Sequence, residues 1–281
     1  MIDLHTHSNC SDGSLTPAQL FAAAEEAGVE AIALCDHNTV AGLPEFMAAA
    51  GGSAVEAVPG SEFSVDYRGR ELHMVALYLP EGCWPAVRKR LEQLRVHKEE
   101  SNRALIAVLQ ADGYHITYEE VLAIARGEWV NRAHVARLLT RKGYTASVKE
   151  AFATLLSRHG GFYVPPKLPD ALETIRFIKA QGAVAVLAHP LLSLGDGELR
   201  EFLPLAKAAG LDAMETMYPL FDGAATEKLR AMAAEFDLLE SGGSDFHGAA
   251  KPDIRIGTGR GELAVPMGVL DALRCRKMVF I

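Results

Sequence analysis

Short apolar segments alternate with helical segments along most of this chain, and this alternation restricts the fold more than any other feature of the sequence. The apolar runs, each with the length and composition of a buried strand, lie at residues 2–4, 31–35, 54–58, 183–188 and 212–217. Between them come helix signals, such as the capping residue Thr16 followed by Pro17. Strands and helices that alternate with short connections are typical of a parallel sheet or barrel, so the sequence predicts an α/β fold.

Two histidines follow the first apolar run directly. His5 and His7 are separated by one residue, so in an extended segment both side chains point to the same side, where one cation could take both. Neutral imidazole suits zinc, manganese or iron, and Asp12, just before a turn glycine, offers a hard oxygen to a second cation. Taken alone, this pattern fits two solvated histidines at a strand end equally well.

Side chains of the metal-ligand types recur at later strands. Glu62 is expected in a loop at residues 59–64 after strand 54–58, and His73 in a strand at residues 71–79. Each of these side chains alone could be a surface residue, a helix cap or a core histidine. Together they fall at the starts or ends of successive strands, where α/β folds keep their sites, so we predict one cluster. The complete predicted set is His5, His7, Asp12, His37, Glu62, His73, His189, Asp245 and His247.

The alternation stops near residue 84 and resumes near residue 168. Helical periodicity continues through residues 84–111, and shorter helical segments are expected at residues 118–126, 132–142 and 147–158. We therefore predict a barrel formed by residues 1–97 and 168–281, and a small helical insertion domain, residues 98–167, that covers the site.

The predicted insertion carries a charge opposite to that of the whole chain. Residues 126–167 contain eight basic and two acidic side chains, a net charge of +6, whereas the whole chain has −8 and the remainder therefore −14. A basic segment in an acidic protein is suited to attract an anionic substrate, although a solvated helix face would also account for several of its charges. Arg132 and His134, at a predicted helix start, and Lys167 are the candidates to bind phosphate.

Composition excludes several classes of protein. A hydrophobic content of 49% is ample for a core, and no apolar run approaches the length needed to cross a bilayer. The four cysteines form no C-x-x-C pair, which argues against a disulfide framework or a thiolate zinc site. No leader-like segment opens the chain. We expect a soluble cytoplasmic protein with no membrane partner.

The order of the motifs resembles one known family. The series is H-x-H at residues 5–7, S-D-G at 11–13, D-H at 36–37, G-x-E-F at 60–63, His73, A-H-P at 188–190 and G-S-D-F-H-G at 243–248. It is similar to that of the PHP family, named for its polymerase and histidinol phosphatase members. The motifs N-R-x-H and Y-V-P-P in the insertion resemble the branch that hydrolyses 3′,5′-nucleotide bisphosphates and short RNA 5′ ends. The resemblance implies a distorted (β/α)7 barrel.

The resemblance also implies two to three divalent ions and their ligands. His5, His7, Glu62 and Asp245 would hold the first ion. Asp12, His37 and His247 would hold the second, and Glu62, His73 and His189 the third. Asp12 stands where some relatives have histidine, which favours Mn²⁺ or Mg²⁺ over Zn²⁺ at the second site. We expect Mn²⁺ to be the bound metal, with Mg²⁺, Zn²⁺ and Fe²⁺ as the alternatives.

The expected activity follows from this ligand set. A hydroxide that bridges two metals would attack the 3′-phosphate of a nucleotide such as adenosine 3′,5′-bisphosphate and leave the 5′-monophosphate. Asp245 and His247 are the candidates to protonate the leaving ribose oxygen, and stabilisation of that oxygen by metal is the alternative.

Three other activities stay open on the sequence alone. They are a 5′–3′ exonuclease on short oligoribonucleotides, a C–N amidohydrolase and a non-catalytic accessory domain. The expected partners are a small anionic nucleotide and, for the exonuclease alternative, short RNA, without stable binding of duplex DNA.

Overall fold

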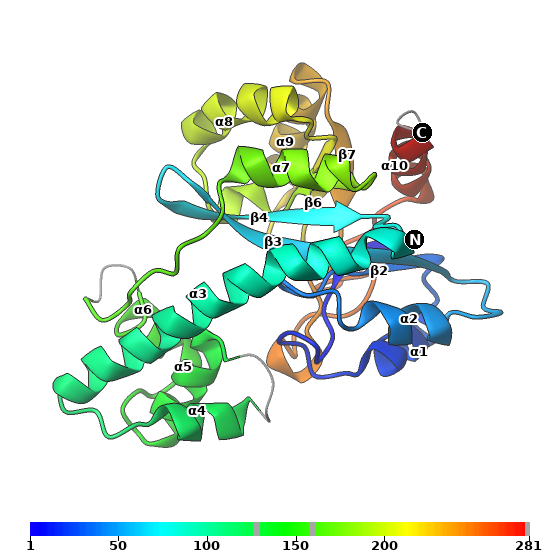
Figure 1. The fold of residues 1–281 in the computed structure, drawn as a ribbon. Helices are drawn as coiled ribbons and strands as arrows, with labels where there is room; N and C mark the ends of the chain where they lie inside the picture. The colour runs from blue at the N-terminus through cyan, green and yellow to red at the C-terminus, as the bar shows by residue number, and fades with distance from the viewer. Residues whose placement is uncertain (126–129, 158–160, 279–281) are drawn as a thin grey trace. The chain divides into compact units, whose positions relative to one another are not determined.

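The computed structural model describes residues 1–125, 130–157 and 161–278 (Figure 1). The chain divides into two compact units, Met1–Lys89 with Pro169–Ile281, and Arg90–Leu168. The sequence prediction placed these boundaries near residues 98 and 167. Arg126, Glu128 and Arg158, which contribute to the predicted basic charge, lie outside the described residues.

Unit 1 is built on one seven-stranded sheet whose strands lie in the order of the sequence. The strands are β1 (Ile2–Thr6), β2 (Ala31–Leu34), β3 (Glu56–Tyr67), β4 (Arg70–Leu77), β5 (Val184–Leu187), β6 (Ala213–Met217) and β7 (Leu239–Gly242). Neighbouring strands are parallel, except that β4 is antiparallel to both β3 and β5. The reversed direction of β4 makes this barrel differ from one in which all strands are parallel.

The sheet closes on itself through backbone hydrogen bonds between its first strand and the segment after its last. Asp245 N donates to His5 O at 2.8 Å, and His7 N donates to Phe246 O at 2.9 Å. At the first residue of β1, Ile2 N donates to Val265 O. Because closure pairs residues 5–7 with residues 245–246, the histidine pair near the N-terminus meets the Asp-x-His motif near the C-terminus.

The sequence prediction was wrong for the segment after residue 58. A loop was expected at residues 59–64, but β3 continues to Tyr67 and forms a hairpin with β4. The residues of this stretch include Val65 and other apolar side chains that are buried within the sheet. Glu62 therefore lies inside a strand, opposite Val75, and its position is fixed by hydrogen bonds on both sides.

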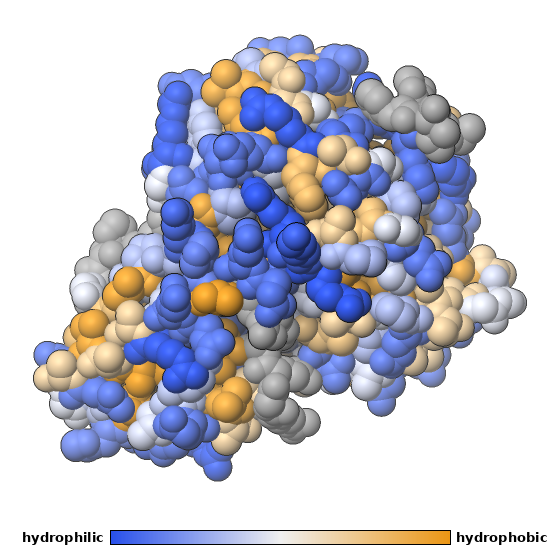
Figure 2. All heavy atoms as spheres, viewed as in Figure 1, coloured by the Kyte–Doolittle hydropathy of each residue, from blue (hydrophilic) through white to orange (hydrophobic). Residues whose placement is uncertain are grey.

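Helices cover the outside of the sheet and one end of it (Figure 1). Those of unit 1 are α1 (Pro17–Ala27), α2 (Leu43–Ala49), α7 (Ala171–Ala180), α8 (Asp196–Ala209), α9 (Gly223–Glu235) and α10 (Met267–Met278). Helix α1 begins with a capping box in which Thr16 accepts from Gln19 N, and it ends at Gly28, whose φ of 69° suits glycine. On the face shown in Figure 2, most residues are hydrophilic, and hydrophobic residues gather mainly at the lower left of the view.

The barrel interior is apolar at one end and polar at the other. Ile2, Val58 and Val186 belong to a buried cluster that includes Leu270 and Leu273 of α10. Helix α10 thereby fills the end of the barrel away from the carboxyl ends of the parallel strands. Burial of this cluster stabilises the sheet and leaves the opposite end for polar side chains.

Unit 2 is helical, as its sequence predicts. Helix α3 (Trp84–Ala111) begins in unit 1 and supplies most of its length to unit 2, where α4 (Tyr118–Ile124), α5 (Arg132–Arg141) and α6 (Val148–Ala153) follow. Leu109, Val121 and Leu139 lie in a buried cluster of its own. Helix α6 is shorter than the segment 147–158 expected from the sequence. None of the helices in the described ranges is both long and apolar enough to cross a bilayer.

Candidate metal centre

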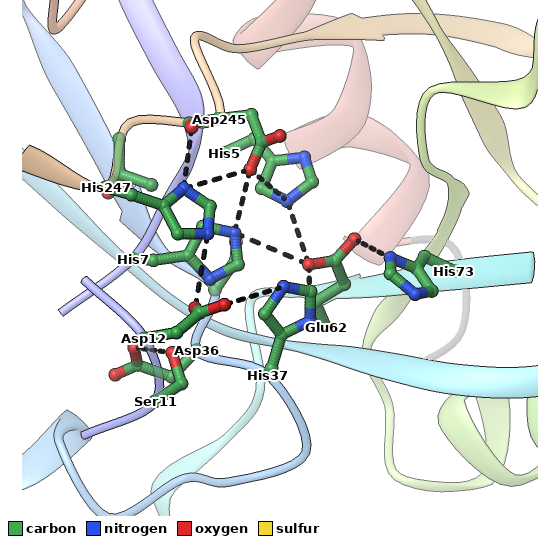
Figure 3. Close-up of polar contacts among 12 residues, drawn as sticks. His5, His7, Ser11, Asp12, Asp36, His37, Glu62, His73, Asp245 and His247 are labelled. Carbon is green, nitrogen blue, oxygen red and sulfur yellow. Dashed lines mark hydrogen bonds and ion pairs between the residues drawn. The ribbon is translucent and has the colours of Figure 1, made fainter. Parts of the chain in front are cut away.

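Glu62 is the centre of the polar end of the barrel (Figure 3). Its carboxylate is fully buried. One oxygen, Oε1, lies 2.8 Å from His73 Nδ1 and 3.0 Å from His189 Nε2. The other, Oε2, lies 3.0 Å from His37 Nδ1 and 3.2 and 3.4 Å from Nε2 of His5 and His7. One carboxylate thus contacts five of the histidines that the sequence singled out.

The histidine pair owes its direction to an irregularity in β1. In a regular strand, successive side chains point to opposite faces, so Leu4 and His5 would not both face the interior. The register of β1 against β2 shifts between Asp3 and Thr6, and this irregularity lets His5 turn toward the barrel interior although Leu4 is also part of the interior cluster. The rings of His5 and His7 lie with centroids 5.0 Å apart.

Asp12, His37 and His247 form one side of the cluster together with His7. His247 Nε2 lies 3.2 Å from Asp12 Oδ1, and His37 Nε2 lies 4.0 Å from Asp12 Oδ2. The loop that carries Asp12 turns at Gly13, where a Cβ atom would lie 2.4 Å from His7 O, so a larger residue there would push the loop away from the histidines.

Asp245 faces the same histidines from the segment that closes the barrel. Its Oδ1 lies 3.1 Å from His7 Nε2 and 3.4 Å from His247 Nδ1. Its backbone is in the left-handed region, with φ of 53°, which is uncommon for a residue other than glycine and which surrounding bonds stabilise here. The hydrogen bond from Asp245 N to His5 O is one such bond.

Buried carboxylates that the sequence analysis did not assign hold this cluster in place. Glu215 on β6 lies 2.7 Å from His5 Nδ1 and also accepts from His189 N at 2.7 Å. Asp36 accepts from Ser8 and from Ser11 Oγ at 2.6 Å, which ties the Asp12 loop to β2. Asp3 accepts from three backbone N–H groups. An acidic residue inside an otherwise apolar strand is the signal that could have identified Glu215.

The donor atoms suit cations better than they suit one another. His5 Nε2, His7 Nε2, Asp12 Oδ1 and Glu62 Oε2 are buried and make no hydrogen bond within the described residues, although they lie near each other. Once His5 loses a proton and keeps Nδ1–H directed at Glu215, the lone pair of its Nε2 faces the carboxylates. Buried nitrogen and oxygen donors that converge without hydrogen bonds between them are stabilised when a cation binds them. The residues therefore fit divalent metal ions.

Four groups of side chains place their donor atoms close enough to share an ion. They are His7–Asp12–His37–His247, His5–His7–Asp245, His5–Glu62–His189 and His37–Glu62–His73. The family resemblance predicts that His73, His189 and Glu62 hold one ion together. In the structure, His73 and His189 both lie next to Oε1 of Glu62. However, His73 is grouped with His37, and His189 is grouped with His5. All nine predicted ligands lie in this one cluster, and their assignment to particular ions stays a prediction.

The charges of the cluster shift its pKa values strongly. Burial by itself raises the pKa of Glu62, but His37, His5 and His73 outweigh it and hold that pKa well below the usual range. Burial lowers the pKa of His73, yet Glu62 and then Glu71 raise it to about 9. Burial and the neighbours His247 and His37 hold the pKa of His7 well below 6.5, so His7 is neutral and has a lone pair to offer.

The predicted phosphate-binding residues belong to unit 2. Arg132 begins α5 and lies over the ring of Tyr163, 4.0 Å from its centroid. His134 is buried, and its Nδ1 accepts from Asn131 N in a capping box, so this atom has a structural role that the sequence analysis did not foresee. Lys167 is exposed. Phosphate binding by these three residues stays a prediction.

The fold and the cluster define a seven-stranded α/β barrel with a cluster of histidines and carboxylates that fits divalent metal ions. Residues 3–164 match the model of the PHP domain family. A 5′-3′ exoribonuclease of Haemophilus influenzae is 36% identical over 250 residues, which cover 87% of this chain and 89% of that protein. The chain belongs to the PHP family, which confirms the resemblance inferred from the motifs.

Two further relatives and one solved structure have names that refer to phosphoester hydrolysis. A phosphoribosyl 1,2-cyclic phosphate 1,2-diphosphodiesterase of Eggerthella lenta is 30% identical, over 88% of this chain and 94% of that protein. A 3′,5′-nucleoside bisphosphate phosphatase of Chromobacterium violaceum is 29% identical, over 88% and 87%. A structure from Bifidobacterium adolescentis, named for a metal-dependent phosphoesterase, has a TM-score of 0.84 and 28% identity, covering 98% of this chain and 96% of that one.

Proposed function

We propose that this protein is a metal-dependent phosphoesterase that removes the 3′-phosphate from a 3′,5′-nucleotide bisphosphate and leaves the 5′-monophosphate. The observation that carries the proposal is the cluster of nine histidine and carboxylate side chains centred on Glu62 and His7, whose donor atoms lie close enough to share cations. Divalent ions bound there, which we propose to be two or three Mn²⁺, lower the pKa of water and offset charge on phosphoryl oxygens.

The names of the relatives support a substrate with two phosphates on one ribose. The Eggerthella protein is named for a phosphoribosyl cyclic phosphate and the Chromobacterium protein for a nucleoside bisphosphate. In this proposal one phosphate reacts at the metal centre. Arg132, His134 and Lys167, the candidates from the sequence, bind the other.

The residues of the chain have distinct parts in this reaction. Glu215 fixes the ring of His5, and the carbonyl of Asp245 lies 2.8 Å from His247 Nδ1, which directs Nε2 of that ring toward Asp12. Asp245 and His247 stay the candidates for protonation of the leaving ribose oxygen. Six of the nine side chains are buried, which strengthens the charge interactions among them, whereas Asp12, His37 and His73 are partly exposed.

A 5′-3′ exoribonuclease is the second candidate. The Haemophilus relative with that name is more similar to this chain than the Chromobacterium phosphatase, at 36% against 29% identity. The same cluster would then act on a diester instead of a monoester.

One substrate panel separates these functions. Manganese-loaded protein is incubated with adenosine 3′,5′-bisphosphate, the 3′- and 5′-monophosphates, a 5′-phosphorylated dinucleotide and histidinol phosphate at matched concentrations. We expect preferential release of phosphate from the bisphosphate, with the 5′-monophosphate as the product. Faster cleavage of the dinucleotide would establish the nuclease instead, and no hydrolysis of any phosphoester would refute both.

A further inference from the structure

Asp245 has two oxygens in different surroundings. Oδ1 faces the histidines, with His7 Nε2 at 3.1 Å and His5 Nε2 at 3.8 Å. Oδ2 points the other way and accepts two hydrogen bonds, from Tyr218 Oη at 2.7 Å and from Lys251 Nζ at 2.6 Å. Neither donor belongs to the predicted ligand set, and the loop that carries Tyr218 received no role in the sequence analysis.

The two donors reach Asp245 from different parts of the barrel. Tyr218 follows β6 directly and is buried, and its ring packs against those of His189 and Phe221. Lys251 follows the short 3₁₀ helix Gly248–Ala250, and its side chain is 39% exposed. Because both donors bond the same oxygen, Oδ2, rotation of the carboxylate would break both hydrogen bonds at once.

We propose that Tyr218 and Lys251 are positioning residues that occupy Oδ2 of Asp245 and thereby leave only Oδ1 for a metal ion. Free rotation would let an aspartate present either oxygen or both, which changes the number of ligands at an ion. A carboxylate with one oxygen held by a hydroxyl and an ammonium group offers a single, directed oxygen. Lys251 also balances part of the negative charge that Asp245 brings to the cluster.

This inference deepens the proposed function and rests on it only in that the cluster binds metal. The test measures binding of Mn²⁺ to metal-stripped protein by calorimetry and by the electron paramagnetic resonance of free Mn²⁺. Removal of such a supporting group weakens metal binding by about 10–100-fold. We expect Tyr218→Phe and Lys251→Met each to raise the Kd of one Mn²⁺ site by that factor, and Lys251→Arg to restore most of the affinity.

Two matched variants control for general damage. Tyr67 is a buried tyrosine whose hydroxyl makes no hydrogen bond within the described residues. Tyr67→Phe therefore removes a hydroxyl group, as Tyr218→Phe does, but breaks no hydrogen bond among these residues. Lys228 pairs with Asp196 at an exposed site, so Lys228→Met removes a comparable ion pair. Both controls should bind Mn²⁺ as the wild type does, and urea midpoints of the metal-free proteins show whether each variant is folded.

The outcomes for the two ideas are distinguishable. Wild-type Mn²⁺ affinity in both Tyr218→Phe and Lys251→Met would overturn the positioning role even if the protein hydrolyses phosphoesters. Weakened affinity in a protein that hydrolyses none of them would support the positioning role and refute the proposed function. If Tyr218→Phe does not fold, the pair Lys251→Met and Lys251→Arg decides, because Lys251 is partly exposed.

Discussion

Replacement of Glu62 by glutamine should change the protonation of the cluster in a way that can be measured residue by residue. The substitution keeps the shape of the side chain but removes the charge that lies 2.8 Å from His73 Nδ1. Burial lowers the pKa of His73, and Glu62 is the largest influence that raises it, to about 9 from 6.5. At 1.36 kcal/mol per pKa unit, the net preference for the charged form is about 3 kcal/mol.

The expected result in metal-free Glu62→Gln protein is a pKa of His73 at or below 6.5, because burial then acts with only Glu71 opposing it. An NMR titration of the ring proton of His73 measures this directly, with His73→Gln to assign the signal. Glu71→Gln is the matched control, since Glu71 lies farther away, 3.8 Å from His73 Nε2, and its removal should lower the pKa much less.

The same shift has a consequence for stability. A histidine whose pKa is higher in the folded than in the unfolded protein stabilises the fold fully below pH 6.5, and this contribution is lost as the pH rises through about 9. The free energy of unfolding of the metal-free wild type should therefore fall by about 3 kcal/mol over this window from His73 alone, and this part of the decline should vanish in Glu62→Gln. A pKa that stays at about 9 in the variant would refute the central position of Glu62.

Three further predictions concern the support of the site, its protons and its closure. Glu215→Gln should weaken Mn²⁺ binding about 10–100-fold in calorimetry, because the ring of His5 loses the carboxylate that orients it. Unchanged affinity would show that Glu215 does not orient His5 for metal binding. Binding of Mn²⁺ at pH 7 should release protons from His5, His73 and His247, whose pKa values are raised in the metal-free protein, with about one proton for each of these ligands that an ion binds; calorimetry in buffers of different ionisation enthalpy measures this number, and a value of zero would contradict it. Gly243→Ala should lower the free energy of unfolding by about 3 kcal/mol or more in urea denaturation, because its Cβ would lie 2.4 Å from His5 N, whereas Gly82→Ala, with open space around it, should change little.

The alternation of strands and helices predicted the barrel well because most of the strands carry their own apolar signal, although β7, with the sequence Leu-Glu-Ser-Gly, does not. The motif spacing also predicted which side chains would meet, since the ends of neighbouring strands lie at one edge of a sheet. The hairpin of β3 and β4 was not predicted, because the glycine and proline at residues 59–60 indicate a turn locally while pairing with β4 keeps the chain extended.

The supporting residues were missed for a different reason. Glu215 is 210 residues from His5, and Tyr218 is 27 residues from Asp245, so no local spacing links either pair. Only closure of the barrel brings them together. The register shift in β1, which directs His5 inward, likewise depends on pairing with β2 and has no local signal.

The measurement that tests the central claim most directly is phosphoester hydrolysis before and after metal is restored. Protein stripped of metal, with its metal content checked by mass spectrometry, is incubated with adenosine 3′,5′-bisphosphate and with a short 5′-phosphorylated oligoribonucleotide, and Mn²⁺ is then added. The account predicts no hydrolysis of either substrate until Mn²⁺ is present, and turnover of at least one of them afterwards. Turnover by the metal-stripped protein at the rate of the manganese-loaded protein would contradict it.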